Sequence, residues 1–514
     1  MLLNPLVLAA IFVANNVCSK SVEEYMATRN QILETENSHF LGSDLELSSE
    51  ENLFNVGLMG DKIEELTRSF FSSEFLPAQW FYLVKDQIEA SSVFQTIRSL
   101  PKGGVLHIHE FAITSGEWVI KNVTYRDNLW MCVDPITTVL HFGWYSGIPE
   151  STDDCHWMEV KQVRLLMGSE NFDKMLQDHL TIITDDPANV YPNVNAVWAK
   201  FSRVFSSLMG LLGYAPVAKD YFYEGFKEFM EDNVNYMEFR TVLPKICPDM
   251  DNCDNPLTKL ETAKLMKEVA DQFILDHPND MCGIRIIYAP SRFVNSNKVE
   301  EYLDTASELM AELPEFVAGF DLVGQEDKGM PLIDFIEPLL NKTEGKNLPV
   351  FFHAGETDWQ GQSTDLNLID ALMLNTTRIG HGYAIAKHPE AKKMAINQDV
   401  PLEVSPISNQ VLNLVVDLRN HPAAILIQEG FPVIISADDP GLWGSKGLSY
   451  DFYEAFMAMS SQTMDLRLLK KFALNSLHYV TLGKEKKDKC QAMFTSKWNS
   501  VMSNYSRTPK ISIL

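Results

Sequence analysis

The sequence predicts an α/β fold, a parallel (β/α)8 barrel of the TIM type, and three observations favour it. Short apolar runs rich in β-branched residues occur eight times between residues 104 and 440, which is the strand number of such a barrel. Most intervals between them can hold the crossover helix that parallel strands require, although the interval between the sixth and seventh runs is short. The competing fold, an open doubly wound sheet, should carry a Gly-rich phosphate loop after its first strand, and the sequence has none there.

The chain begins with a segment of signal-peptide character. Residues 1–19, MLLNPLVLAAIFVANNVCS, have an apolar middle, no charge and small or short residues near the end. This composition predicts a secretory signal peptide cut near Ser19, although the usual basic start is missing; a buried N-terminal helix is the alternative. Residues 20–100 then place apolar residues at three- and four-residue spacing, which predicts a helical N-terminal segment.

The barrel is predicted to occupy residues 101–514, because a Pro-Lys-Gly-Gly sequence ends the helical pattern and opens the first strand. The eight predicted strands are GVLHIHE at 104–110, VNYMEFRT at 234–241, GIRIIYAP at 283–290, VAGFDLVG at 317–324, PVFFHAGE at 349–356, TRIGHGYA at 377–384, PLEVSPIS at 401–408 and PVIISADDP at 432–440. The interval between the first two strands is long, and its polar part, residues 121–180, is interpreted as an inserted surface module.

Composition and charge exclude several classes of protein. Hydrophobic residues make up 46% of the chain and charged residues 22%, which is typical of a folded globular protein and not of a disordered one. Lys and Arg number 43 and Asp and Glu 69, so the net charge is −26. Such a surface repels nucleic-acid polymers and anionic membranes. After the N-terminal segment, no uncharged apolar run is long enough to span a bilayer.

Sequons and cysteines agree with an oxidising, extracellular location. Four Asn-x-Ser/Thr sequons are predicted glycosylation sites: Asn122, Asn341, Asn375 and Asn504. Cys132 and Cys155 flank the polar stretch of the insertion and are predicted to form a disulfide, while Cys247 and Cys253 could close a small loop. Cys282 precedes an apolar strand and is interpreted as a buried free thiol. Spacing alone does not fix the pairing.

Four histidines lie in or directly after predicted strands: His107, His109, His353 and His381. His107 and His109 are two residues apart, so they face the same side of one strand, and the carboxyl ends of the strands form the active site of a TIM barrel. Three imidazoles with the carboxylate of Asp438, which ends the eighth strand, are a ligand set suited to zinc. A single strand histidine is more often a core residue, but four at strand ends indicate a metal site.

Three further polar groups accompany these ligands. Glu356 follows His353 by three residues and could move protons between a water and a substrate, although a helix N-terminus also favours a glutamate. His381 could reach the same water from the next strand, either holding it or accepting its proton. Asp438 and Asp439 are adjacent acids in an apolar segment, which is costly unless a cation or hydrogen bonds meet them. That cost argues against a purely structural role.

Six segments carry a resemblance that covers nearly the whole chain after residue 19: PKGGVLHIHE, FDLVGQED, FFHAGETDWQG, LNTTRIGHGYA, EVSPISNQVL and SADDPGLWGSKGLSYDFYEAF. Together they resemble the adenosine deaminase family of metal-dependent hydrolases, most closely its secreted branch, the adenosine deaminase-related growth factors. The resemblance implies one zinc ion per subunit, held by His107, His109, His353 and Asp438. It also implies that residues 20–100 are a dimerisation domain of a homodimer and that the insertion at 121–180 binds a cell-surface receptor.

The resemblance implies a role for each remaining residue of the site. Glu356 corresponds to the acid that protonates N1 of the purine ring, and His381 to the histidine that orients the attacking water with Asp438. Asp439 corresponds to the aspartate that faces N7, which requires a proton on one of the two partners. Gly324 corresponds to the glycine whose backbone N–H meets N3. Trp198 corresponds to a contact on the ribose side.

The implied reaction is the hydrolytic deamination of adenosine, and of 2′-deoxyadenosine, to inosine and ammonia, which would lower extracellular adenosine. Glu110 stands where the family usually has an aspartate on the ribose 5′ side, so a 5′-phosphate would be repelled. The zinc deaminases that use a P-C-x-x-C run are excluded, because the chain has no C-x-x-C. The alternative function is that of a secreted receptor-binding growth factor whose signalling is independent of catalysis.

Overall fold

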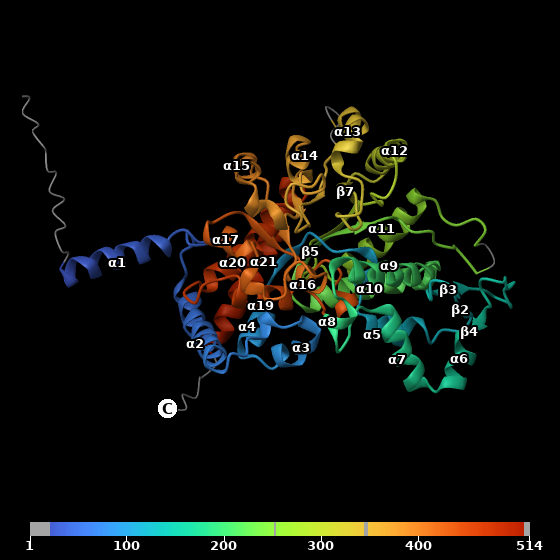
Figure 1. Ribbon diagram of the computed structural model, residues 1–514, viewed down its shortest axis with the longest axis horizontal. Coiled ribbons are helices and arrows are strands. Elements are labelled where there is room, and N and C mark those ends of the chain that lie inside the picture. The colour runs from blue at the N-terminus through green and yellow to red at the C-terminus, as the bar shows by residue number, and fades with distance from the viewer. Residues whose placement is uncertain (1–20, 251–252, 344–347, 508–514) are drawn as a thin grey trace, which may run out of the picture.

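Eight parallel strands form a closed barrel at the centre of the molecule, as predicted (Figure 1). The computed structural model describes residues 21–250, 253–343 and 348–507, so the predicted signal peptide at 1–19 lies outside the described residues. The strands pair in the orders β1-β5-β6-β7 and β11-β10-β9-β8. Two parallel bridges, Phe320 with Val350 and Ile108 with Asp438, join these groups and close the ring.

All eight predicted strands are confirmed, but most are shorter than the apolar runs that predict them. The barrel strands are β1 Gly103–Val105, β5 Val234–Thr241, β6 Gly283–Tyr288, β7 Val317–Phe320, β8 His353–Ala354, β9 Ile379–His381, β10 Leu402–Val404 and β11 Val433–Ile435. The runs outlast the strands because their carboxyl ends leave the ladder and turn over the mouth of the barrel. That is the end of the barrel at which a site is expected.

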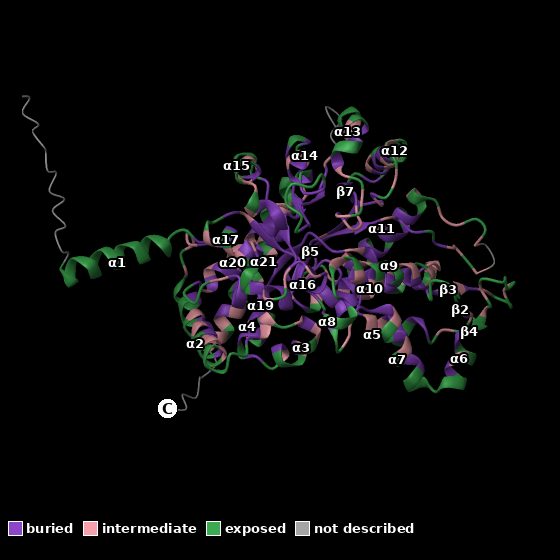
Figure 2. Ribbon diagram, viewed as in Figure 1, coloured by how far each residue is buried: buried purple, intermediate pink, exposed green. Residues whose placement is uncertain are grey.

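Helices follow the strands and cover the barrel. They include α11 Lys259–Asp276, α12 Ser296–Glu312, α13 Ile336–Thr343, α14 Asn367–Met373, α15 Pro389–Gln398, α17 Ala423–Gln428 and α20 Leu466–His478. The short interval between the sixth and seventh barrel strands still holds a helix, α15. Figure 2 shows the strands as buried and the outer helix faces as exposed, so the apolar runs of the sequence form the interior.

The N-terminal segment is helical, as predicted, and most of it belongs to the folded body. Its helices are α1 Val22–Glu36, α2 Ser49–Ser72, α3 Phe81–Glu89 and α4 Ser92–Ser99. α2 packs on the last helix, α21 Lys484–Arg507, and α4 packs on α19 Ser449–Ala458. In α2 the ammonium of Lys62 is buried. It donates hydrogen bonds to Ser460 Oγ and to two backbone carbonyls of the same loop, which lies between α19 and α20. In contrast, α1 has no buried residue and stands away from the body (Figure 1).

The insertion after the first strand is a small module at the opposite end of the molecule from α1 (Figure 1). It contains a three-stranded antiparallel sheet, β2 Leu129–Val133, β3 Leu140–Trp144 and β4 Met158–Glu159, and the helices α6 Val160–Met167 and α7 Ser169–Leu180. The sequence did not predict these strands, since they are short and only partly apolar. The predicted disulfide between Cys132 and Cys155 is present in this module.

Two more disulfides are present, and one of them corrects the sequence interpretation. Cys247 and Cys253 close the small loop that their spacing suggested. The interpretation of Cys282 as a free thiol is wrong, because it is bonded to Cys490 on α21. The two cysteines are 208 positions apart in sequence, and they meet because α21 returns to pack against the barrel strands β1 and β5.

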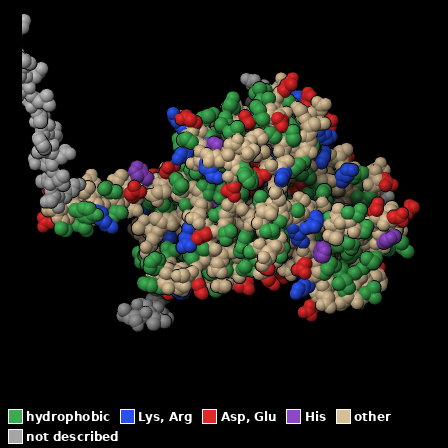
Figure 3. All heavy atoms as spheres, in the orientation of Figure 1, with side chains coloured by type: hydrophobic (Ala, Val, Ile, Leu, Met, Phe, Trp, Pro, Cys, Tyr) green, Lys and Arg blue, Asp and Glu red, His purple; other side chains and the backbone are tan. Residues whose placement is uncertain are grey.

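The sequon asparagines and many charged side chains lie on the surface of the protein. The four sequon asparagines, Asn122, Asn341, Asn375 and Asn504, are all exposed. Figure 3 shows acidic and basic side chains scattered over one face, with hydrophobic side chains along the α1 arm. Within the described residues, no helix combines the length and apolar character needed to cross a membrane.

Candidate active site

The predicted site residues gather around one cavity of about 330 Å³ at the carboxyl ends of the barrel strands. Its lining includes every predicted residue except the fully buried His107: His109, Glu110, Trp198, Gly324, His353, Glu356, His381, Asp438 and Asp439. The volume is at the lower end of the range for small-molecule sites. A larger hollow of about 1320 Å³ lies between the insertion, α3 and α9 Val194–Leu211, and it contains none of these residues.

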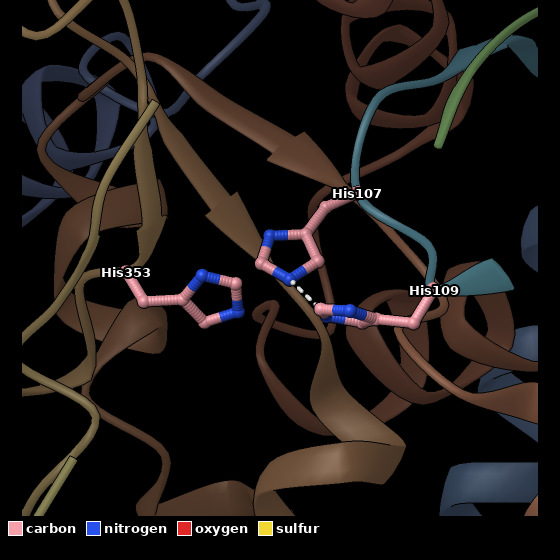
Figure 4. A group of neighbouring side chains, drawn as sticks. All are labelled: His107, His109 and His353. Carbon is pink, nitrogen blue, oxygen red and sulfur yellow. Dashed lines mark hydrogen bonds between the residues drawn. The ribbon is translucent and has the colours of Figure 1, made fainter. Parts of the chain in front are cut away.

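Four possible metal ligands converge at the bottom of this cavity. Nε2 of His107 lies 3.3 Å from Nε2 of His109 (Figure 4). Oδ1 of Asp438 lies 3.0 Å from Nε2 of His109 and 3.5 Å from Nε2 of His107. The ligand atoms of His107, His109 and His353 lie within 4.8 Å of one another. Oδ1 of Asp438 accepts no well-directed hydrogen bond within the described residues.

The far sides of two histidines show which of their nitrogens are free to bind a metal. Nδ1 of His107 lies 2.9 Å from the carboxylate of Glu403, and Nδ1 of His353 lies 2.7 Å from the carboxylate of Asp321. Each Nδ1 therefore carries the proton, and each Nε2 presents a lone pair toward the cluster. Carboxylate–histidine pairs of this kind orient the ligands of metal sites. The donor set therefore fits a metal ion.

An ionic layer that the sequence analysis missed supports these carboxylates. Arg240 donates to Asp321 at 2.7 Å and to Glu403 at 2.8 Å. Arg378 donates to Glu403 at 2.5 Å and to Glu238 at 2.6 Å. All five side chains are at most 1% exposed. The available signal was the presence of charged residues inside runs predicted as buried strands, as in YMEFR and PLEV.

The proton states of Glu356 and Asp439 are set by burial beside other acids. Burial and the nearby Asp438 carboxylate raise the pKa of Glu356 well above its ordinary value. The same two causes raise the pKa of Asp439 well above its ordinary value, and Oδ1 of Asp439 has no partner within the described residues. Before a ligand or metal binds, both carboxyls are therefore held as neutral acids that can donate a proton.

His381 and Asp438 have strained backbones that aim their side chains into the cavity. Their φ angles are 59° and 57°, in the left-handed region that residues other than glycine rarely adopt. Nε2 of His381 lies 3.6 Å from Oε1 of Glu356 and 3.9 Å from Oδ2 of Asp438. Burial lowers the pKa of His381 well below its usual value. The ring is therefore neutral in the site.

The remaining predicted contacts line the upper cavity. Glu110 is buried and accepts hydrogen bonds from the Thr241 hydroxyl and from Val242 N–H at 2.8 Å, and burial raises its pKa to about 7. Gly324 has a φ of 114°, and a Cβ there would lie 2.8 Å from the ring of Phe293, so only glycine fits. Trp198, on α9, is half-buried at the rim.

Comparison with known proteins decides the family. Residues 177–493 match the family model described as adenosine deaminase, and residues 6–97 match adenosine/AMP deaminase N-terminal. The chain is 43% identical over 474 residues to adenosine deaminase 2-A of Danio rerio, which covers 92% of each chain. The chain belongs to the adenosine deaminase family. It is thus a hydrolytic deaminase, and the resemblance stated from its motifs is confirmed.

Other relatives and solved structures agree with this membership. The chain is 41% identical over 480 residues to adenosine deaminase 2 of Homo sapiens, covering 93% of each. In fold it is similar to an Arabidopsis N6-mAMP deaminase, with a TM-score of 0.55 and 17% identity over 78% of this chain and 99% of that one. An amidohydrolase of Burkhoderia ambifaria with bound Zn has a TM-score of 0.54 and 17% identity over 81% and 95% of the chains. These two similarities show the shared fold.

Proposed function

We propose that this member of the family is a zinc-dependent deaminase that converts adenosine, and 2′-deoxyadenosine, to inosine and ammonia. The observation that carries the proposal is the convergence of three imidazoles and Asp438 beside a carboxyl, Glu356, that is held protonated. A metal–ligand set and a proton donor at one cavity are what hydrolysis at a ring carbon requires. The names of the relatives at 40–43% identity support adenosine as the substrate.

The donor set fits one zinc ion per subunit, held by His107, His109, His353 and Asp438. When bound there, zinc would supply a water of lowered pKa, toward about 7, as the nucleophile. Asp321 and Glu403 orient two of the imidazoles, and Ser408 donates to Oδ2 of Asp438 at 2.6 Å. These contacts hold the ligand atoms in place before a metal arrives.

The chain's own residues would bind the purine and supply its protons. Glu356 donates a proton to N1, which makes C6 electrophilic and is the step that burial of this carboxyl prepares. Asp439, also held neutral, donates a hydrogen bond to N7. The backbone N–H of Gly324 meets N3, and Trp198 covers the ribose. His381 contacts the attacking water from the next strand.

The cavity favours a nucleoside over a nucleotide. Its lining offers an anionic group only one Lys or Arg side chain, Arg240, among the acids Glu110, Glu356, Asp438 and Asp439. The Arg240 guanidinium already forms ion pairs with two carboxylates. Its positive charge is therefore neutralised and would attract a phosphate only weakly. Some solved structures of similar fold are complexes with GMP or IMP, and for this chain we propose the unphosphorylated substrate instead.

We also propose that the protein is secreted and acts on extracellular adenosine. Three disulfides are typical of an oxidising compartment, and exposed sequons are accessible to glycosylation. A homodimer would use the N-terminal helical segment, because the α1 arm exposes a set of apolar side chains: Val22, Tyr25, Met26, Ile32 and Leu33. Exposed apolar surface of this kind marks interaction sites.

The direct test is ammonia release by the purified chain from adenosine, 2′-deoxyadenosine and AMP. We expect turnover of the two nucleosides and at least about 100-fold lower kcat/KM for AMP, because the lining leaves the 5′-phosphate without an unpaired Lys or Arg. Turnover of AMP as fast as of adenosine would contradict the nucleoside assignment. Absence of turnover with every substrate would contradict the proposed activity.

A receptor-binding role is the second candidate, favoured by the insertion. Ile136, Ile148 and Leu166 are each at least 87% exposed on this module, which is unusual for large apolar side chains. Signalling and catalysis are separable by the variant Glu356→Gln in a cell-growth assay. If this inactive variant still stimulates growth, signalling is independent of deamination; if stimulation disappears with activity, adenosine removal accounts for it.

A further inference from the structure

The chemical role of His381 depends on which of its two ring nitrogens carries the proton. Nε2 faces the site, 3.6 Å from Glu356 and 3.9 Å from Asp438. Nδ1 faces away and lies 3.2 Å from Nδ2 of Asn409, on α16 Pro406–Val411. With its proton on Nε2, the ring donates a hydrogen bond to a water in the site; with a bare Nε2, it accepts that water's proton.

The position of this proton follows from a hydrogen-bond chain that begins at the backbone. The N–H of Ala423 lies 3.0 Å from Nδ1 of His421 and donates to it. A backbone amide can only donate, so Nδ1 of His421 carries no proton. Burial lowers the pKa of His421 to about 3, so the neutral ring has its one proton on Nε2. That N–H donates to Oδ1 of Asn409 at 2.9 Å.

Asn409 transmits this polarity to His381. Because its amide oxygen accepts from His421, its NH₂ group must face His381. An NH₂ group donates, so Nδ1 of His381 is the acceptor and the ring proton lies on Nε2. The amide orientation is therefore set by the Ala423 backbone, which has no alternative orientation.

The surroundings hold both members of the chain in place. Asn409 is fully buried and His421 is 2% exposed. The backbone carbonyl of Asn409 accepts hydrogen bonds from Leu414 N–H and Val415 N–H. The ring of Tyr383 meets His421 edge to face, with the ring centroids 5.2 Å apart. Neither side chain can turn over without breaking buried contacts.

We propose that Asn409 and His421 are positioning residues that hold His381 as the tautomer protonated on Nε2. His381 then donates a hydrogen bond to the attacking water and does not act as its base. The proposal rests on the proposed function and deepens it, because it decides between the two roles that the sequence left open for His381. The proton of the water must then pass to another group, and the Glu356 carboxylate can accept it once it has given its own proton to N1.

The first test reads the tautomer itself and requires no substrate. Long-range ¹⁵N–¹H correlation spectra of the full chain labelled with ¹⁵N-histidine distinguish a protonated ring nitrogen from a bare one. The signal of His381 is the one that disappears in His381→Gln. We expect a protonated Nε2 and a bare Nδ1 in the wild-type chain. A protonated Nδ1 on His381 would overturn the proposal.

The second test changes only the polarity of the chain. Asn409→Asp has the same shape, but its carboxylate accepts and does not donate, so the His381 proton is expected to move to Nδ1. Loss of the donor in the site should lower kcat for adenosine by about 10²–10⁴-fold. KM should change by less than about threefold, because adenosine does not contact Asn409. A folded variant with kcat within about threefold of wild type would contradict the proposal.

A matched control separates the tautomer effect from the cost of burying a carboxylate. Asn235→Asp also replaces a fully buried asparagine, at the opposite end of strand β5 from the site. It should leave the His381 spectrum unchanged and kcat within about threefold of wild type. If Asn409→Asp fails to fold, the wild-type spectrum still decides. A protonated Nε2 in a chain that releases no ammonia from adenosine would support the positioning chain and contradict the proposed function.

Discussion

Two groups of buried charge meet in the barrel, and they differ in how their charges are balanced. In the ionic layer, the acids Glu238, Asp321 and Glu403 each contact Arg240 or Arg378 at 2.5–2.8 Å. The acids of the site are Glu356, which follows strand β8, and Asp438 and Asp439, which follow strand β11. Among the described residues, no Lys or Arg forms an ion pair with any of the three.

The difference separates a frame from a binding site. Balanced charges hold the histidine ligands in one orientation, and breaking a buried pair is strongly destabilising. Acids buried without a cationic partner cost stability in the empty protein, and binding of a metal ion or substrate would relieve this cost. We therefore expect changes in the ionic layer to act mainly on stability, and changes at the site to act mainly on catalysis.

The largest expected effect comes from the site. Glu356→Gln removes the proton donor and should lower kcat by about 10²–10⁴-fold, while the metal content stays at one per chain. The unfolding temperature should be unchanged or higher, because an uncompensated buried acid is removed. Ammonia release, metal analysis and thermal unfolding measure the three quantities. Near wild-type turnover in this variant would contradict the assignment of Glu356.

The next largest effect should come from the ionic layer. Arg240→Met leaves Asp321 without its arginine and Glu403 with only one, which should lower the free energy of unfolding by about 3–5 kcal/mol. Arg240→Lys keeps the charge and is the matched control, with a smaller loss expected. Urea denaturation measures both. A loss below about 1 kcal/mol for Arg240→Met would show that the layer is not the frame described here.

A change far from both groups sharpens the comparison. Replacing Cys282 and Cys490 by serine together should lower the free energy of unfolding by about 2–4 kcal/mol, because α21 is no longer tied to the barrel. The turnover number should stay near that of wild type at a temperature where the variant is folded. If the folded variant had a clearly lower turnover number than wild type, the site would depend on the rigidity of the whole fold and not only on its ionic layer.

The smallest expected effect concerns how the free energy of unfolding depends on pH, compared between wild type and Glu356→Gln after treatment with a chelator. His353 and Arg240 lower the pKa of Asp321 despite its burial. The stability that Asp321 contributes is therefore present above the unfolded pKa of about 4 and is lost as pH falls. The Glu356 pKa is raised by burial, so stability is lost as pH rises above about 4. Glu356→Gln should therefore lose less stability than wild type as the pH rises from 4 to 8. Equal pH profiles for the two proteins would contradict the raised pKa.

Much of the fold and of the site was predictable from local sequence. The eight strands are continuous apolar runs, and His107, His109, His353, His381 and Asp438 stand at their ends, where a parallel barrel must bring them together. The sequence also marks charged residues inside those runs, but it does not tell which acid meets which base. Arg240 and Glu403 are 163 positions apart, and their pairing depends on closure of the barrel.

The same limit explains the other differences. Cys282 and Cys490 meet only because the last helix returns to the first strands, so the interpretation of Cys282 as a free thiol had no local evidence against it. The tautomer proposed for His381 depends on Asn409, on α16, and on His421, in the loop before α17, and both follow a different strand, β10. Neither residue has a spacing that marks it, and the role of both appears only in the hydrogen-bond directions.

The most direct test of the account is to remove and restore the metal while following adenosine deamination. We predict that a chelator abolishes turnover, and that zinc restores it in proportion to occupancy, reaching full rate at one zinc per chain. Unfolding should remain cooperative without the metal, because the ionic layer holds the ligands in place. Full turnover in protein whose zinc content is far below one per chain would contradict the central claim that the converging histidines and Asp438 hold a catalytic metal.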